Sequence, residues 1–278
     1  KIVPSLDDLK KRIKSVKSTQ KITKAMKMVA AAKLRKAQEN AEKGRPYSQK
    51  MQNIILNLTK SINDTNNAPK LLVGTGNDKT YLCVVLTADR GLCGGFNSNI
   101  CRLAKLNFKK ILSEGKNLKI ITVGSKGLDQ IKRDYGKHII KKFSFKEKKQ
   151  IKFSEAETIG NEIINLFKKN EFDKCILFFN NFKNVITQIP QAQQIIPIEI
   201  SSKIKEERNL QYGFEPDEDE ILEDLLPKNI STQIFKAFLE NAASEQGSRM
   251  TAMDNATRNA GELVDKLTIN YNRSRQAS

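Results

Sequence analysis

Two long helical patterns, one at each end of the chain, restrict what this sequence can fold into more than any other feature. The first runs from about Ser5 to about Asn57 and meets no glycine before Gly44 and no proline before Pro46. A helix of about 50 residues is on the order of 75 Å long, which is more than a globular core can cover. Such a helix needs a partner, and the second pattern, residues 228–278, supplies one.

The apolar residues of the first helix predict a coiled-coil seam with one interruption. They step by three and four at Leu6, Leu9, Ile13 and Val16. After a polar interval over residues 17–21 they resume as Ile22, Met26, Val29, Ala30, Leu34, Ala37 and Ala41. We interpret the interval as a phase slip that changes the local supercoil and contributes to an asymmetric rod.

The first helix is also strongly basic. It carries eleven Lys and Arg residues between Lys10 and Lys36 and no acidic residue in that range. Like charges repel along a helix, and an external acidic surface would relieve that repulsion. The whole chain has a net charge of +18, which favours nucleic acid, anionic lipid or an acidic protein surface as a partner. A solvated helix face is the alternative interpretation.

The C-terminal helix, residues 228–278, has an apolar stripe that can face the first helix. Its members are Ile230, Ile234, Phe238, Ala242, Met250, Met253, Ala260, Leu263, Leu267 and Tyr271. Small residues, among them Ala243 and Gly247, allow a second helix to approach closely. The two ends of the chain therefore predict an antiparallel pair of shaft helices, formed by residues 1–60 and 228–278.

Between these helices the sequence has an α/β pattern over residues 78–205. Buried strands are predicted at 81–87, 119–124, 138–143 and 175–181, and two further strands at 184–190 and 193–200 close the region. Because helices separate the earlier strands, we expect a Rossmann-like domain with a mostly parallel sheet. The closing strands follow short turns, so that edge is expected to be antiparallel. Residues 206–227 are predicted to form an acidic linker, with seven acids between Glu215 and Asp224.

The sequence offers no catalytic, cofactor or metal site. The turn GLCGG at residues 91–95 matches neither GxGxxG nor a P-loop, and no acidic residue ends the next strand to hold a ribose. His138 is the sole histidine, so neither a catalytic triad nor a zinc site is expected. The four cysteines lack CxxC spacing and fit a reducing compartment. We expect a non-enzymatic protein without a cofactor.

Three separated segments resemble one family. They are KSTQKITKAMKMVAAAKLRKA near the N-terminus, LTADRGLCGGFN in the middle and ASEQGSRMTAMDNATRNAGELVDKLTINYNRSRQAS at the C-terminus. Together they closely resemble the gamma subunit of the F-type ATP synthase. The resemblance implies a central-stalk rotor subunit that couples rotation of the c-ring to conformational cycling of the catalytic beta subunits, without catalysing the reaction itself.

The same resemblance implies partners and contact residues. The terminal helices would form a shaft inside a hexamer of alpha and beta subunits. The α/β domain would stand on the c-ring beside the epsilon or delta subunit, with membrane contact only through the c-ring. By motif, Met26 sits where the shaft passes the acidic lever of a beta subunit, Arg275 and Gln276 fall at a hydrogen-bonding catch with a beta loop, and Arg90 lies at a second contact near the base of the beta subunits. The cysteine pair of redox-regulated chloroplast relatives is missing, so we expect no thiol switch.

A basic coiled-coil protein that binds nucleic acid is the alternative function. It requires aromatic or base-reading side chains among the lysines, and the first helix offers only Tyr47, so we expect no nucleic acid. Lys1 suggests a cleaved targeting segment or an incomplete chain. Together with the C-terminal motifs it favours the matrix side of the mitochondrial inner membrane, with the cytoplasmic face of a bacterial inner membrane as the alternative. In the family that this sequence resembles, the chain usually extends past the position that corresponds to Ser278.

Overall fold

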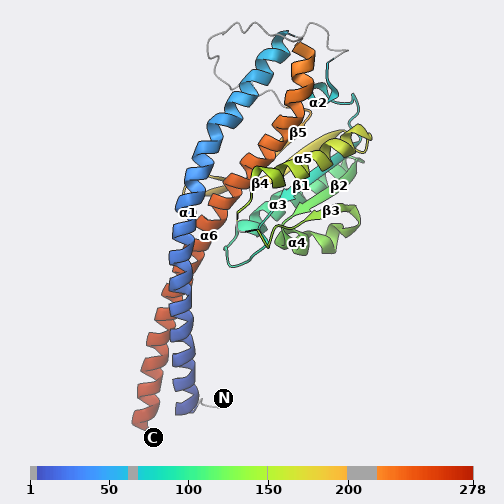
Figure 1. Ribbon diagram of the computed structural model, residues 1–278. Helices are drawn as coiled ribbons and strands as arrows, with labels where there is room; N and C mark the ends of the chain where they lie inside the picture. The colour runs from blue at the N-terminus through green and yellow to red at the C-terminus, as the bar shows by residue number, and fades with distance from the viewer. Residues whose placement is uncertain (1–4, 62–67, 149, 199–217, 278) are drawn as a thin grey trace.

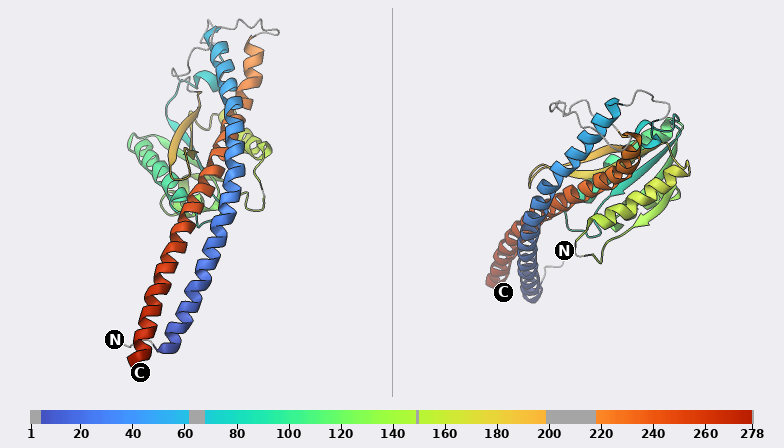
Figure 2. Two further views of the ribbon diagram at one scale, coloured as in Figure 1. Left: turned by 90° about the vertical axis from the view of Figure 1, so that its left-hand side faces the viewer. Right: turned by 45° about the horizontal axis from the view of Figure 1, so that its top comes forward.

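The computed structural model describes residues 5–61, 68–148, 150–198 and 218–277. Helix α1 (Leu6–Ser61) and helix α6 (Glu218–Ala277) form a long antiparallel pair, and an α/β head packs against one side of it (Figure 1). The start of α1 and the end of α6 lie together at the free end of the pair, and the two helices cross as they wind around each other (Figure 2). The molecule is a rod with a head, as the sequence predicts.

The seam of the shaft keeps one register along its whole length, so the predicted phase slip is wrong. Buried and half-buried residues of α1 follow two heptad positions, which are Leu9, Val16, Thr23, Ala30 and Ala37, and Ile13, Gln20, Lys27, Leu34 and Ala41. Polar Gln20 and Thr23 simply continue the seam. Ile22 and Val29, which we expected to lie in it, are 57% and 55% exposed. An unbroken seven-residue repeat imposes a left-handed supercoil.

Helix α6 shows the same repeat beyond the head and a different environment beside it. Its seam residues towards the free end are Met253, Thr257, Ala260, Val264, Leu267 and Tyr271. Leu263, which the sequence suggested for the stripe, is 40% exposed because Val264 takes that position. Beside the head, none of residues 229–244 is exposed, since α1 covers one face of the helix and the head covers the other.

The second shaft helix begins ten residues earlier than predicted. Residues 218–227, expected to belong to the acidic linker, form the first turns of α6, with Pro227 inside the helix. Leu222 and Leu226 are fully buried against α1 residues such as Ile55 and Leu58, and this packing extends the helix. The rest of the predicted linker, residues 206–217, lies outside the described residues.

The head contains a five-stranded sheet in the order β3-β2-β1-β4-β5. Its strands are β1 (Thr80–Leu86), β2 (Asn117–Val123), β3 (Ile139–Phe143), β4 (Lys174–Phe182) and β5 (Gln188–Ile196). All neighbouring pairs are parallel except β4 and β5, which confirms the predicted antiparallel edge. A single strand, β5, replaces the two closing strands that we expected, because Asn184 accepts hydrogen bonds from the amides of Ile186 and Thr187 and so closes a turn there.

Helices cover both faces of the sheet. They are α3 (Phe96–Ser113), α4 (Ser125–Tyr135) and α5 (Phe153–Lys168). The short helix α2 (Lys70–Val73) packs Leu72 against the shaft helices, and a 3-10 turn spans Gly136–His138. One core lies between the sheet and helices α3 and α4, with Phe108 and Ile131 at its centre. The other core lies between the sheet, α5 and α6, and includes Ile163, Ile230 and Ile234. The shaft helix α6 is therefore also a structural layer of the head.

Candidate coupling surfaces of the shaft and head

The basic surface of α1 is largely unpaired within the molecule. Of the eleven Lys and Arg residues between Lys10 and Lys36, two form ion pairs with described residues: Lys27 with Asp254 at 2.6 Å, and Arg35 with Glu39 at 3.5 Å. Both pairs are exposed and contribute little to stability. The shaft therefore presents a strongly positive face to its surroundings.

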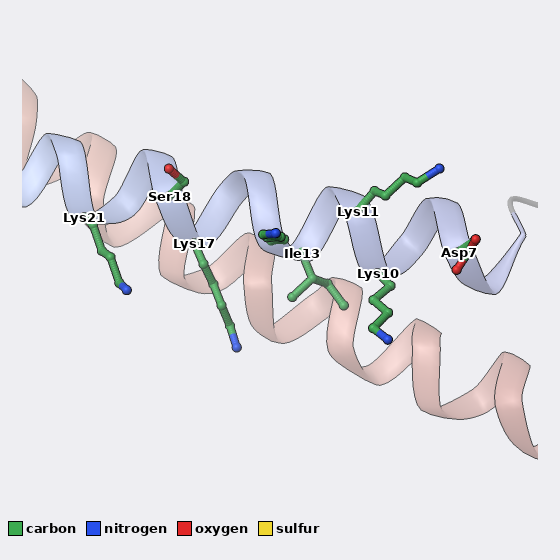
Figure 3. A pocket seen from close by; sticks show the side chains of 8 residues that line it. Asp7, Lys10, Lys11, Ile13, Lys17, Ser18 and Lys21 are labelled. Carbon is green, nitrogen blue, oxygen red and sulfur yellow. The ribbon is translucent and has the colours of Figure 1, made fainter.

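Near the free end this basic surface encloses a shallow groove. The groove has a volume of about 660 Å³ and is lined by Asp7, Lys10, Lys11, Ile13, Lys14, Lys17, Ser18 and Lys21. Lys10, Lys17 and Lys21 extend from one side of α1, whereas Lys11 points to the other (Figure 3). The lysines at 10, 14, 17 and 21 each follow a seam residue, so they form a continuous stripe beside the helix-helix contact. Such a stripe suits an acidic protein surface.

The loop between β1 and α3 is held rigidly against the head. Asp89 accepts hydrogen bonds from the Ser125 amide at 2.8 Å, the Ser144 hydroxyl at 2.8 Å and the Phe145 amide at 3.0 Å. From the shaft, Arg249 donates to the Gly91 carbonyl at 3.1 Å. The sequence motif marked this loop, but it did not reveal that Asp89 anchors it.

Two exposed side chains project from the anchored loop. Arg90 is exposed, as its predicted contact role requires. Leu92 is 64% exposed and has a φ of 59°, a left-handed conformation that costs a non-glycine residue about 1–2 kcal/mol. An exposed apolar residue in a strained backbone is a feature of binding sites. The sequence alone did not point to Leu92, because backbone strain at a residue other than glycine leaves no signal in composition.

The edge of the sheet where a Rossmann-like domain would bind a ligand is filled by the shaft. In open α/β sheets that position lies beyond the carboxyl ends of the strands where the strand order reverses, here between β1 and β4. Asn241 of α6 donates to the Leu86 carbonyl at 3.1 Å and accepts from the Asn180 amide at 2.8 Å. These bonds use a backbone group at the end of β1 and another two residues before the end of β4. The head therefore uses this edge to hold α6.

The four residues predicted as coupling contacts are spread along the molecule and do not form one site. Met26 is half-buried in the shaft, one turn from Thr23, and Arg90 lies on the head. Arg275 and Gln276 are exposed in the last turn of α6. Thr23 faces Thr257, so Arg275 lies roughly 27 Å beyond that level, at about 1.5 Å per residue.

The residues often used for metal binding and nucleophilic catalysis, Cys and His, have structural surroundings here. No group of three or more His, Cys, Asp or Glu side chains within them could hold a metal ion. The four cysteines are free and buried, and burial raises the pKa of the Cys101 thiol to about 11. His138 lies beside the Leu118 carbonyl at 3.1 Å, a local contact at the sheet edge. Over the same residues, no helix is long and apolar enough to cross a membrane.

The fold and these surfaces define a class of protein: an asymmetric helical shaft with a head at one end, built for contact with other subunits. Comparison with known proteins narrows the class. The family model described as ATP synthase matches residues 5–278. An ATP synthase gamma chain of Pelagibacter ubique is 71% identical and one of Sinorhizobium medicae is 56% identical, each over 99% of this chain and 94% of the relative. The chain therefore belongs to the ATP synthase gamma chain family.

Solved structures have the same fold. The central stalk of the Tetrahymena thermophila mitochondrial ATP synthase aligns with a TM-score of 0.62 and 27% identity over 84% of this chain and 99% of that chain. The rotor of the Euglena gracilis mitochondrial ATP synthase aligns with a TM-score of 0.64 and 18% identity over 98% of both chains. The second match supports the fold alone.

Proposed function

We propose that this chain is the rotating central shaft of an ATP synthase, which couples rotation of a membrane-embedded c-ring to conformational change in catalytic beta subunits. The observation that carries the proposal is its similarity to gamma chains over 99% of its length. The similar Tetrahymena structure combines a central stalk with a c-ring, which supports the same arrangement here.

The shaft acts as a ligand that each beta subunit encounters in a different orientation. Its two helices differ in charge: α1 has eleven basic residues and no acid between Lys10 and Lys36, whereas the exposed part of α6 alternates acids with bases, as at Asp254 and Arg258. Rotation brings the basic face to one beta subunit after another. A ligand shifts a conformational equilibrium only if it binds the two conformations with different affinity. In this proposal the basic face and the mixed-charge face of the shaft favour different conformations of a beta subunit.

The contacts that transmit rotation must break and form again in every turn. Exposed ion pairs are worth about 0–1 kcal/mol each, which suits that requirement. In this proposal Met26 and the lysine stripe meet the acidic lever of a beta subunit, and Arg275 with Gln276 binds a beta loop near the free end. Arg90 and Leu92 meet the base of the beta subunits.

The subunit is non-catalytic in this proposal, and catalysis belongs to the hexamer that surrounds it. The head stands on the c-ring beside the epsilon or delta subunit, and membrane contact is made through the c-ring alone. The similar gamma chains of Pelagibacter and Sinorhizobium are bacterial, which supports the cytoplasmic face of a bacterial inner membrane over our first expectation of a mitochondrial location. No observation favours nucleic-acid binding, since the exposed Tyr47 lies beyond the end of the basic segment.

Co-assembly tests the proposed function. The chain should purify in one complex with the alpha and beta subunits of its own organism, and the membrane-bound complex should pump protons when it hydrolyses ATP. Recovery of the chain bound to DNA, with no affinity for the hexamer at low salt, would contradict the proposal. A steep decrease of DNA affinity with salt would identify the alternative function.

A further inference from the structure

A charged residue of α1 reaches across the shaft to α6 at the level of the head. Arg45 donates from Nε to Oε1 of Glu240 at 2.8 Å and from Nη2 to Oε2 at 3.1 Å. This is the two-bonded pairing of a guanidinium with a carboxylate, which is both strong and specific in geometry. The pair therefore fixes the axial register of α1 relative to α6.

The same two side chains also hold the head. Nη2 of Arg45 donates to the Phe182 carbonyl at 3.1 Å, and the Phe182 amide donates to Oε2 of Glu240 at 3.0 Å. Phe182 is the last residue of β4, so both backbone groups at the end of this strand are bound, one by each shaft helix. We call Arg45, Glu240 and the backbone of Phe182 the clamp.

The carboxylate of the clamp is buried, whereas the guanidinium is partly exposed. The side chain of Glu240 is 2% exposed and that of Arg45 is 38% exposed, so salt screens the pair less than the exposed pairs of the shaft. The hydrogen bond to Glu240 raises the pKa of Arg45. Nearby, burial lowers the pKa of Lys236, and Glu42 adds a negative charge on α1. Buried ion pairs often add little net stability but select one arrangement of the groups around them.

The clamp differs from the other attachments between head and shaft. Asn241 binds the Leu86 carbonyl and the Asn180 amide, but it joins α6 alone to the sheet. Leu34 of α1 packs near Phe182 and Ala243, and such apolar contacts permit sliding. The clamp ties α1, α6 and β4 together through directional bonds. A turn of the head about the shaft axis would distort the two bonds to Phe182, and a shift of α1 along α6 would distort the two bonds between Arg45 and Glu240.

We propose that Arg45 is a positioning residue for coupling, which with Glu240 locks the head to both shaft helices so that torque applied to the head reaches α1 and α6 together. The inference rests on the proposed rotor function. Without the clamp, α1 remains joined to α6 through the coiled-coil seam, the exposed Lys27–Asp254 pair and the neutral hydrogen bond from Gln233 to Ser48, which are weaker than a charged pair with two hydrogen bonds. The basic face of α1 then follows the head with greater angular freedom.

Angular fluctuations of the head test this directly. In the complete ATP synthase, the hexamer is fixed to a surface and a bead is attached to the head through Lys142→Cys, an exposed site on β3; the native cysteines are buried and do not compete for the label. In the pauses between steps, Arg45→Met should increase the variance of the bead angle, because the charged bond that joins α1 directly to the head is lost while the bonds of Asn241 and Arg249 to the head remain. The matched control, Lys105→Met with Asp134→Asn, removes a 2.6 Å ion pair inside the head and should leave the variance unchanged.

Arg45→Met leaves the buried Glu240 carboxylate without its partner, so the variant could fail to assemble. A second variant keeps the test decisive in that case. Arg45→Met with Glu240→Gln removes both charges and should show the same increase in variance. Hydrogen exchange at the Phe182 amide should be about tenfold faster in this double variant, since a charge-assisted acceptor is lost. Rotation with unchanged variance in the assembled variants would overturn the role of the clamp. A head that does not rotate in the unmodified complex would instead overturn the proposed function.

Discussion

At the scale of single residues, the loop 88–95 shows how this protein pairs a rigid support with a strained contact. Three hydrogen bonds to Asp89 and one from Arg249 fix the loop, and Leu92 is left exposed with a φ of 59°. The hydrogen bonds hold Leu92 in the strained conformation, and its side chain is 64% exposed. We therefore assign the benefit of the strain to the assembled complex.

Replacing Leu92 with glycine should separate the cost of the strained backbone in the isolated subunit from its benefit in the assembled complex. Leu92→Gly relieves the left-handed conformation, and the isolated subunit should gain up to about 1 kcal/mol in its free energy of unfolding in urea. In the assembled enzyme the same variant should pump fewer protons per ATP. Asn170→Gly is the matched control, because Asn170 has a φ of 57° on the far side of the head. Unchanged pumping by Leu92→Gly would exclude Leu92 as a contact.

The last turn of α6 carries the second test at this scale. Arg275 and Gln276 are exposed, so Arg275→Ala with Gln276→Ala should leave the subunit folded, with a change in unfolding free energy within about 0.5 kcal/mol. Coupling and assembly should both weaken, because a hydrogen-bonded contact with a beta subunit is lost. The measurement is ATP-driven proton pumping relative to ATP hydrolysis. Pumping equal to that of the unmodified enzyme would refute the predicted catch.

At the scale of helices and strands, periodicity predicted most of the fold. The alternation of apolar strands with helices gave the α/β head, and the short final connections gave its antiparallel edge. The order β3-β2-β1-β4-β5 and the insertion of α6 as a layer could not be predicted, because they depend on packing between segments far apart in the chain. The clamp was equally hidden, since Arg45 and Glu240 are separated by 195 positions.

Two predictions about the shaft were wrong for the same reason: the phase slip in α1 and the start of α6 at residue 228. We treated charged and polar side chains as evidence against burial, yet a heptad position can bury a polar residue when its hydrogen bonds are satisfied. Thr23 and Thr257 show this, with hydroxyl oxygens 2.7 Å apart across the seam and the carbonyls of Gln20 and Met253 within hydrogen-bonding distance. One hydroxyl donates across the seam and the other donates to its carbonyl. Likewise the acidic segment before α6 concealed Leu222 and Leu226, which continue the apolar stripe by steps of four.

The threonine pair should contribute to the register of the shaft. Thr23→Val or Thr257→Val alone breaks the hydrogen bond across the seam and should lower the free energy of unfolding. The double variant places two apolar groups together and should be close to neutral. The two single variants and the double variant form a double-mutant cycle, for which we expect a coupling energy of about 0.5–1.5 kcal/mol, measured by urea unfolding of the isolated subunit. Additive effects of the two substitutions would show that the hydroxyls act independently.

The lysine stripe should act in assembly, with little effect on folding. A variant with four substitutions, Lys10, Lys14, Lys17 and Lys21 each to Gln, should bind the hexamer more weakly by at most about 1 kcal/mol per lysine and with a smaller dependence on salt. Its melting temperature should not fall, because these side chains have no ion pairs among the described residues.

The control for this variant has the same change in charge on the head. It carries Lys109, Lys110, Lys137 and Lys142, all exposed, each replaced by Gln. If both variants lose the same affinity for the hexamer, the effect comes from net charge and the stripe has no specific role.

At the scale of the whole molecule, the protein joins two requirements in one chain. A shaft must be slender, and the strict heptad repeat of α1 and α6 provides a long helix pair with small seam residues. A head must be stiff, and the two cores on either side of the sheet provide that. Helix α6 belongs to both parts, and the clamp adds α1. These features explain how rotation of the head could reach the far end of the shaft.

Direct observation of rotation tests the central claim most directly. The chain carrying Lys142→Cys is assembled with alpha and beta subunits, the hexamer is fixed to a surface, and a bead on the head is followed during ATP hydrolysis. We expect stepwise rotation in one direction that stops when ATP is removed. A complex that hydrolyses ATP at its full rate while the head stays at a fixed angle would contradict it.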